Sequence, residues 1–453
     1  MHTPANSAVI RQLFVDYYAA QDYRLLPRAP MMDPSIPMSF VMSAGLVQIE
    51  TSLARQTERQ GNKFVLVQDC FRHFDLDKVG TDGTHLSLFE MPGAFVFGPD
   101  GKAGTVQRMW ALATSILGMD PARIWASYFK GGDVLQNNLP EDTVTRQAWR
   151  TVGLPEQRII GLGADYNYWV QGRGINGMTT PRKCGPNTEL FFDQGVDKAC
   201  GAACQPGCAC GRFVEFSNSL FIAYELDAQG PVLRPLAEPF TETVIGTERV
   251  AMILQSAPSV FDIEGYRPLI DMIHQFVRNT DLSEAMRVFS ERVIADYLRA
   301  LYCLAADGAP PPGKNGRERI IKLLIRGVLT HQIVLGIESP RFLPTLLNRV
   351  APMISGSLDA SATRERLASY FQFEAQRFSK TVERGHRQLL RFLQENDGET
   401  LSDSQIVSLE KKWGLPRALT TLLARDKSLD GMPSRCQAVL ETLGAVMPRA
   451  IPA

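Results

Sequence analysis

Residues 184–192 read CGPNTELFF, and residues 243–249 read TVIGTER. The first stretch passes from a glycine–proline turn into a run of apolar residues, as a loop does when it enters a β-strand. In the second stretch, a β-branched run reaches Gly246, and Glu248 and Arg249 follow where a strand would pass into a helix. We infer that the two stretches hold strands of one sheet and a charged site at the end of one of them.

The sequence around these stretches, from about residue 30 to 250, consists of short apolar runs separated by glycine and proline. Its alternation and aromatic content predict an antiparallel sheet, with helices such as 104–118 packed against it. Ser7 is a candidate N-cap for an earlier helix, whose apolar residues recur at helical spacing. The residues on that helical face are Ile10, Leu13, Phe14, Tyr17 and Tyr18.

After residue 250 the hydrophobic period becomes helical. The predicted helices include 248–255, 284–307, 317–336 and 362–395. The apolar face of the last helix is formed by Leu367, Tyr370, Phe371, Phe378, Val382, Leu389 and Phe392. The stretch GAPPPGKNG, at 308–316, is expected to be a turn between two helices. The sequence therefore predicts an α+β chain with a mixed part at 1–250 and an all-helical part at 251–453.

The composition of the 453 residues is that of an ordinary globular protein, with 45% hydrophobic and 21% charged residues. Lysine plus arginine (48) equals aspartate plus glutamate (48), so nucleic acid would have to be bound by a local basic patch. No apolar run approaches the ~20 residues of a membrane span, and the N-terminus lacks the pattern of a secretion signal. We expect a cytoplasmic protein without membrane association.

Four of the eight cysteines lie in one loop, KACGAACQPGCACGR at 198–212. Because the cytoplasm keeps scattered thiols reduced, such a cluster indicates a metal site more than disulfides. Four thiolates fit a tetrahedral Zn²⁺ site, and a site closed by four protein ligands is structural. The predicted ligands are Cys200, Cys204, Cys208 and Cys210. An iron–sulfur cluster, a redox pair or a loop without metal are the alternatives.

A second charged constellation lies in QDCFRHFDLDKVG (68–80) followed by HLSLFEMPGAFVFG (85–98). An arginine on one strand and an aromatic residue on the returning strand can grip an α-phosphate and stack on adenine. Taken alone, the same pattern is also typical of a core hairpin with a surface arginine.

In order, spacing and flanking sequence, these motifs resemble those of alanyl-tRNA synthetases, a family of class II aminoacyl-tRNA synthetases. The resemblance extends from Ile10 to about Thr420. The matching stretches are MSAGLVQIE (42–50) for the first motif, FEMPGAFVFG (89–98) for the second, GTERV (246–250) for the third, and RVIADYLRA (292–300) and TVERGH (381–386) for the helical tRNA-binding region. The resemblance implies a six- or seven-stranded antiparallel sheet with helices, followed by a helical domain. We expect the chain to lack the family's editing domain.

The resemblance implies an ATP site formed by Arg72, Phe89, Glu90, Met91, Gly246 and Arg249. Arg72 would bind the α-phosphate, Phe89 would stack on adenine and Arg249 would hold the far face of the nucleotide, with Glu248 beside it in the third motif. The implied reaction is attack of an amino-acid carboxylate on the α-phosphate, which gives an aminoacyl adenylate and pyrophosphate. This step depends on positioning and charge neutralisation, and Mg²⁺ is expected with the nucleotide.

The resemblance also implies an amino-acid pocket, in which Trp169 and Asn218 match the family. Glu242 stands where the family has an aspartate that holds the amino group, and Val244 stands where it has a glycine. Glu242 keeps the carboxylate, but its side chain is one methylene longer than that of aspartate. The Val244 side chain fills pocket space that a glycine would leave empty. Since one methylene changes discrimination by ~1 to 3 kcal/mol, the pocket is expected to accept alanine, glycine or another small amino acid.

Basic residues in the helical half are candidates for contacts with tRNA, within 313–328 and 364–391. A charged helix face is also typical of a helix that is simply solvated. In the family, an asparagine and an aspartate of this half read the acceptor stem. Asn315 matches the asparagine, Arg317 lies beside it, and Lys411 stands at the position of the aspartate.

We therefore expect an enzyme that activates a small amino acid with ATP and transfers it to tRNA, in a specialised biosynthetic route. One alternative is a ligase that passes the aminoacyl group to a carrier protein, a small amine or a downstream biosynthetic enzyme. Another is a non-catalytic RNA-binding or regulatory protein that kept the fold.

Overall fold

The computed structural model describes residues 6–33, 49, 61–98, 101–172, 181–227, 232–353, 359–396, 400–425 and 436–440. By its internal contacts the chain divides into two compact units. Unit 1 comprises Met1–Ala29, Ser43–Cys70 and Phe89–Ile263, and unit 2 comprises Pro30–Met42, Phe71–Leu88 and Glu264–Ala453. The stretch MSAGLVQIE at 42–50 lies outside the described residues, apart from Ile49.

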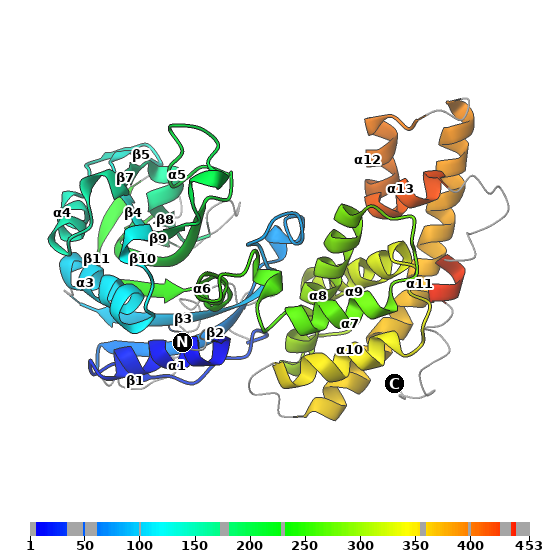
Figure 1. The fold of residues 1–453 in the computed structure, drawn as a ribbon, viewed down its shortest axis with the longest axis horizontal. Helices are drawn as coiled ribbons and strands as arrows, with labels where there is room; N and C mark the ends of the chain where they lie inside the picture. Colours follow the sequence, from blue (N-terminus) through cyan, green and yellow to red (C-terminus); the bar gives the residue numbers. More distant parts are fainter. Residues whose placement is uncertain are drawn as a thin grey trace. The chain divides into compact units, whose positions relative to one another are not determined.

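A nine-stranded sheet organises unit 1, with the order β1-β2-β3-β11-β10-β9-β4-β7 and with β8 paired to β9 (Figure 1). Its strands are β1 (Arg24–Leu25), β2 (Lys63–Phe71), β3 (Leu88–Phe97), β4 (Ile124–Phe129), β7 (Ile159–Leu162), β8 (Tyr168–Val170), β9 (Arg182–Asp193), β10 (Phe213–Leu226) and β11 (Leu233–Ile245). A separate two-stranded sheet is formed by β5 (Gly132–Val134) and β6 (Asn137–Leu139).

The predicted antiparallel sheet is confirmed for the central strands, since β3, β11, β10, β9 and β4 pair antiparallel in that order. At the two edges, β1 pairs parallel to β2 and β7 pairs parallel to β4. The sheet also has more strands than the six or seven that the resemblance implied. The additional strands are short, and β1 has only two residues, so no alternating pattern in the sequence could reveal them.

The described helices of unit 1 are α1 (Ser7–Ala19), α3 (Lys102–Ala111), α4 (Thr143–Thr151), α5 (Ala164–Asn167) and α6 (Thr247–Leu254). Of these, α1, α3 and α6 were predicted from the sequence. The first helix buries Ile10, Phe14 and Tyr18 as predicted, but its N-cap is Asn6, whose side chain accepts from the Val9 N–H, and not Ser7. The predicted helix at 104–118 is α3, continued by a π-helical turn at Leu112–Ile116 (η2).

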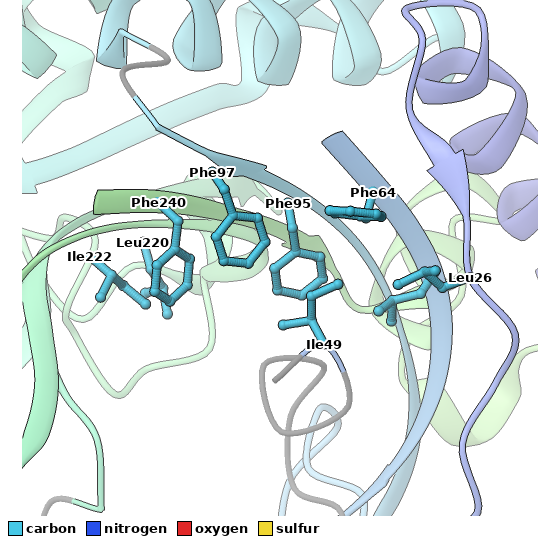
Figure 2. Close-up of a cluster of buried hydrophobic side chains, with 9 residues drawn as sticks. Leu26, Ile49, Phe64, Phe95, Phe97, Leu220, Ile222 and Phe240 are labelled. Carbon is cyan, nitrogen blue, oxygen red and sulfur yellow. The ribbon is translucent and has the colours of Figure 1, made fainter. Parts of the chain in front are cut away.

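Phenylalanine side chains dominate the apolar core on one face of the sheet, which Figure 2 shows. Phe97 stacks on Phe240 at 5.0 Å between ring centroids, and Phe64 meets Phe97 edge-on at 6.1 Å. Ile49, Leu26 and Ile222 complete the contacts around them (Figure 2). Burying side chains of this size contributes about 1.5 to 3 kcal/mol each, so this cluster fixes the register of the strands that carry the site.

In unit 2, the described residues after Ile263 are mainly helical. Its helices are α7 (Arg267–Phe276), α8 (Glu284–Ala306), α9 (Gly316–Val334), α10 (Phe342–Val350), α11 (Ala360–Glu395), α12 (Asp403–Lys411) and α13 (Arg417–Arg425). The 36-residue α11 packs on α8, α9 and α10 (Figure 1) and buries Leu367, Phe371, Phe378, Val382 and Leu389, as its sequence period predicts. The predicted turn at 308–316 is confirmed between α8 and α9. Among the described helices, none combines the length and apolar character of a membrane-spanning segment.

Candidate functional site

The residues predicted to form the amino-acid pocket lie on one face of the unit 1 sheet. Asn218 of β10 pairs with Val244 of β11, and Val244 pairs with Gly93 of β3. One step along the same face, Glu242 pairs with Phe95. Because directly opposed residues of antiparallel strands share a face, the strand register brings these positions together.

The residues predicted to bind adenine extend this face. Phe89 and Met91 alternate with buried residues along β3, in phase with Gly93 and Phe95. Both side chains are partly exposed. An aromatic ring and a thioether are thus available to a planar ligand beside the polar positions of β11.

Trp169 of β8 reaches the same face opposite Gly185 and packs against the phenylalanine core. Gly185 cannot carry a side chain, because a Cβ there would lie 1.9 Å from the Phe221 carbonyl oxygen, at an irregularity in the pairing of β9 with β10. The glycine of CGPNTELFF therefore allows β9 and β10 to approach closely beneath the tryptophan.

A polar network links β9 to β10 on this face. The Asn218 amide donates to Glu189 Oε1 at 3.1 Å, and the Asn187 amide donates to Glu189 Oε1 and Asn218 Oδ1, both at 3.3 Å. Asn187 is 3% exposed, and its Oδ1 has no hydrogen-bond partner among the described residues. Burial, and then the neighbouring Glu215, raise the pKa of the Glu189 carboxyl well above its ordinary value. The network brings a buried carboxylate and two amide side chains together on this face.

Arg249 lies next to this network, in the first turn of α6. Its guanidinium donates to the backbone carbonyl of Glu215 at 2.9 Å and to the Glu215 carboxylate at 3.2 Å. The Arg249 and Glu215 side chains are 29% and 38% exposed, so these contacts orient a cation that solvent still screens in part. Gly246 precedes the helix, and its N–H donates to the Phe216 carbonyl, which places the start of α6 beside the first residues of β10.

Glu90 and Glu248 are both buried, at 8% and 5% exposure, and they join three elements. The Glu90 carboxylate accepts from Arg11 Nε at 2.7 Å and from the Thr247 hydroxyl at 2.8 Å, and its backbone N–H donates to the Glu248 carboxylate at 3.1 Å. Burial raises the pKa of Glu90, and Arg11 opposes that shift. These contacts tie α1, β3 and α6 together, so both glutamates hold the backbone of the site in place.

Arg72, predicted to bind the α-phosphate, belongs to unit 2. It follows β2 directly, and its backbone N–H donates to the Ser87 carbonyl at 2.9 Å. Its side chain is partly exposed. The residues after it form a short 3₁₀ turn, His73–Asp75, in which Phe74 is 62% exposed.

The cysteine-rich loop connects β9 to β10. The Sγ atoms of Cys200, Cys204 and Cys210 all lie within 4.8 Å of one another, with 3.5 Å between those of Cys204 and Cys210. Two thiolates bound at ~2.3 Å to a tetrahedral zinc ion would lie about 3.8 Å apart. Three of the four predicted ligands are therefore gathered, and the thiol of Cys208 neighbours that of Cys200.

The base of this loop is fixed by a bidentate ion pair. Arg212 Nε and Nη2 lie 2.7 and 2.6 Å from the two carboxylate oxygens of Asp193, and this pairing lowers the pKa of Asp193. Cys204 packs with Phe191 and Phe213 in a small apolar cluster against the loop. The backbone N–H of Arg212 lowers the pKa of the Cys210 thiol to about 7.

The residues predicted to contact tRNA have different surroundings. Asn315 is exposed at the N-terminus of α9, and Lys411 is exposed at the end of α12. Arg317 donates to the backbone carbonyls of Met32 and Asp33 at 3.2 and 3.1 Å, so its guanidinium also holds the chain at that point.

The basic segments predicted at 313–328 and 364–391 contribute side chains to one groove between α9 and α11. It has a volume of about 550 Å³ and is lined by Arg326, Arg377, Lys380, Thr381, Glu383, Arg384 and Arg387. Arg326 is held by the buried Glu374 at 2.6 Å. Burial, and then Arg326, lower the pKa of the neighbouring Lys322. The groove, which we call the α9–α11 groove, concentrates positive charge on a chain of zero formal net charge.

Sequence reasoning missed Glu189, Asn187 and Glu215 as members of the site. Glu189 and Asn187 lie inside CGPNTELFF, but only the pairing of Glu189 with Asn218 across two strands reveals their role. The signal that could have found them is a buried strand that carries a carboxylate and an amide at spacing two, since those side chains share a face.

Comparison with known proteins relates the chain to one family. The family model for class II tRNA synthetases (A) matches residues 9–434. The alanine–tRNA ligase of Desulforudis audaxviator is 30% identical over 428 residues, which cover 94% of this chain and 46% of the relative. That of Rubrobacter xylanophilus is 32% identical over 437 residues, covering 94% and 48%. The chain thus spans about half the length of the curated relatives it matches.

Solved structures also align with the chain. The histidyl-tRNA synthetase of S. aureus aligns with a TM-score of 0.33 and 12% identity, covering 56% of this chain and 67% of that one. The pyrrolysyl-tRNA synthetase of Desulfitobacterium hafniense aligns with a TM-score of 0.29 and 11% identity, covering 58% and 76%.

Proposed function

The chain belongs to the class II tRNA synthetase (A) family, and from that membership we propose that it activates a small amino acid with ATP and transfers the acyl group to tRNA. The observation that carries the proposal is the shared sheet face of Asn218, Glu242 and Val244, with Arg249 at its end. We assign the activation chemistry to residues 1–250 and the tRNA contacts to residues 251–453.

In the proposed reaction, Glu242 receives the ammonium group of the amino acid, and Asn218 and Trp169 hold the rest of the small substrate. Arg72 binds the α-phosphate, Phe89 stacks on adenine, and Arg249 neutralises charge on the far side of the nucleotide. The amino-acid carboxylate attacks the α-phosphorus, and the bond to the leaving pyrophosphate breaks. Such a step needs fixed cations and fixed distances rather than a nucleophile from the protein.

The Glu189 and Glu215 carboxylates are candidate oxygen ligands for Mg²⁺. Glu189 accepts from Asn218 and Glu215 accepts from Arg249, so Mg²⁺ would share these carboxylates with protein donors. When bound, it would neutralise the developing charge of pyrophosphate.

Glu242 and Val244 set the size of the proposed amino-acid pocket, for which alanine, glycine and another small amino acid are the candidate substrates. Glu242 is 3% exposed, and the Val244 side chain lies beside the position where a Cβ on Gly93 would be, at 3.4 Å. The valine therefore occupies volume that a glycine would leave to the substrate. This favours a specialised biosynthetic role for the aminoacyl product.

We further propose that the cysteine loop binds a structural zinc ion through Cys200, Cys204, Cys208 and Cys210. Protein purified without chelator should contain about one equivalent of zinc by elemental analysis. The variant Cys204→Ser should lose the metal and about 2 to 4 kcal/mol of unfolding free energy, because the loop connects β9 to β10.

The matched control for this prediction is Cys303→Ala, which removes a buried thiol from α8. It should keep the full zinc content. Equal metal content in wild type and Cys204→Ser would rule out these thiolates as the ligands, as would less than about half an equivalent of zinc or iron in the wild type.

The α9–α11 groove supports contact with tRNA phosphates. The double variant Lys380→Glu and Arg384→Glu should raise the KM for tRNA at least about 10-fold, because each lost phosphate contact weakens binding. Amino-acid activation without tRNA should not change. Kinetics of tRNA charging at several salt concentrations would measure the effect, with a reduced salt dependence in the variant.

Arg349→Glu provides the control for this charge reversal, since Arg349 is exposed on α10 and does not line the groove. A comparable loss in this variant would mean that net charge, and not the groove, governs tRNA binding.

The proposed function as a whole is tested by supplying ATP and each of a panel of small amino acids to the purified chain. Hydroxylamine traps an activated acyl group as a hydroxamate, and acid-precipitable label on total tRNA reports transfer. Hydroxamate and charged tRNA for the same amino acid are the expected result. Hydroxamate without charged tRNA would assign the acyl group to a different acceptor. The absence of both products would refute activation.

A further inference from the structure

Residues 71–88, the hairpin segment that contains Arg72, are docked on helix α8 within unit 2. Their principal contact is Asp296, a carboxylate without exposed surface in the middle of α8. Asp296 accepts the Ser87 backbone N–H at 3.1 and 3.2 Å, and it also accepts the Ser87 hydroxyl. A third donor is the Tyr266 hydroxyl at 3.1 Å.

Two further residues of α8 contact the same segment. The Tyr297 hydroxyl donates to the Leu76 carbonyl at 3.0 Å. Phe289 lies against Gly80, where a Cβ would be 3.0 Å from the phenylalanine ring and where φ is +80°. Asp296 and Tyr297 follow Phe289 by seven and eight residues, which is about two helical turns, so all three lie on one side of the helix. The segment is thus held at Leu76, Gly80 and Ser87 by a single helix face.

Ser87 links Asp296 to the backbone of Arg72. The Ser87 carbonyl accepts the Arg72 backbone N–H at 2.9 Å, while the N–H and hydroxyl of the same serine donate to Asp296. Ser87 therefore joins the backbone of Arg72 to a fixed point on α8. Displacement of Ser87 would move the start of the Arg72 loop.

We propose that Asp296 is a positioning residue for ATP: through Ser87 it sets the backbone at Arg72 and thereby the orientation of the phosphate-binding arginine. This inference rests on the proposed function, in which Arg72 binds the α-phosphate. The contacts themselves do not depend on it.

The chemistry of Asp296 agrees with a positioning role. Burying a carboxylate costs free energy unless donors compensate it, and here donors from Ser87 and Tyr266 surround it. Burial nevertheless raises its pKa to about 6. Arg299, one turn further along α8, stacks over the Tyr266 ring at 4.1 Å and orients that donor.

The test compares Asp296→Asn and Ser87→Ala with Glu291→Gln. Glu291 is a matched control because it is also a buried carboxylate on α8, at 2% exposure, but it pairs with Arg287 and His274. In amino-acid-dependent pyrophosphate exchange, Asp296→Asn and Ser87→Ala should raise the KM for ATP by about 10- to 100-fold, since a small misplacement of a binding group is costly. The KM for the amino acid should stay within about twofold, because its pocket is formed by other residues.

A purely structural role would lower the melting temperature without selectively raising the KM for ATP, and that result would overturn the proposal. Ser87→Thr keeps the hydroxyl and should restore the KM that Ser87→Ala loses. An unchanged KM for ATP in both Asp296→Asn and Ser87→Ala would also overturn it.

Hydrogen–deuterium exchange separates this proposal from the proposed function. Amides of residues 72–87 should exchange faster in Asp296→Asn than in the wild type or Glu291→Gln, whether or not any amino acid is activated. Equal protection in all three proteins would overturn the anchoring by Asp296. If Asp296→Asn exchanged faster than the wild type and the wild type activated no amino acid, the anchoring by Asp296 would be supported and the proposed function refuted.

Discussion

Arg249→Ala is expected to lower kcat/KM for amino-acid-dependent pyrophosphate exchange by about 10²- to 10³-fold. The Arg249 guanidinium is half-buried and oriented by the carbonyl and carboxylate of Glu215, so it needs no rearrangement to meet developing negative charge. Arg249→Lys should recover little of this activity, because an ammonium group lacks the planar fork that bridges Glu215 and a phosphate. Exchange of labelled pyrophosphate into ATP, at saturating amino acid, measures the effect.

The control for this substitution is Arg234→Ala. Arg234 is on β11 in the same unit and also pairs with a carboxylate, Asp227 at 3.1 Å, but its side chain is 70% exposed. Exposed ion pairs contribute little to stability, so the exchange kinetics of Arg234→Ala should match those of the wild type. Retention of full exchange activity by Arg249→Ala would remove Arg249 from the ATP site.

Glu242→Gln is expected to raise the KM for the amino acid by about 10- to 100-fold and to leave the KM for ATP unchanged. A charged hydrogen bond to a buried carboxylate is worth about 1.5 to 3 kcal/mol, and glutamine keeps the shape of the side chain while losing its charge. Glu242 is 3% exposed and lies one step along the strand from Val244, on the same sheet face. Exchange kinetics with the amino acid as the varied substrate measure the change.

The matched control is Glu238→Gln, the same substitution at an exposed position of the same strand. It should have no effect on either KM. If Glu242→Gln raised the KM for ATP instead, the ammonium site would have to be reassigned.

The strands and helices that carry the site were predictable from the sequence where the hydrophobic period was long and regular. The helix α11 is the clearest example, and β9 and β10 were indicated by shorter apolar runs, whereas only the TVI end of β11 was indicated. The two-residue strand β1 was not predictable, because it is too short to show a period. The first helix was predicted with Ser7 as its cap, but Asn6 performs that role one residue earlier, since both side chains are good caps.

The composition of the site was less accessible, because cross-strand register and long-range contacts decide it. Glu189 belongs to the network only because β9 pairs with β10 at Asn218. The contact between Ser87 and Asp296 joins residues that are 209 positions apart, and no local pattern encodes it. Similarly, Glu248 could be recognised from its motif, but its carboxylate accepts the N–H of Glu90 on a different strand.

The most direct test of the account is pyrophosphate exchange by the wild-type chain, replete with metal, with a panel of small amino acids. The account predicts incorporation of labelled pyrophosphate into ATP that depends on one small amino acid and on Mg²⁺. Absence of exchange with every amino acid, from folded protein that contains zinc, would contradict it.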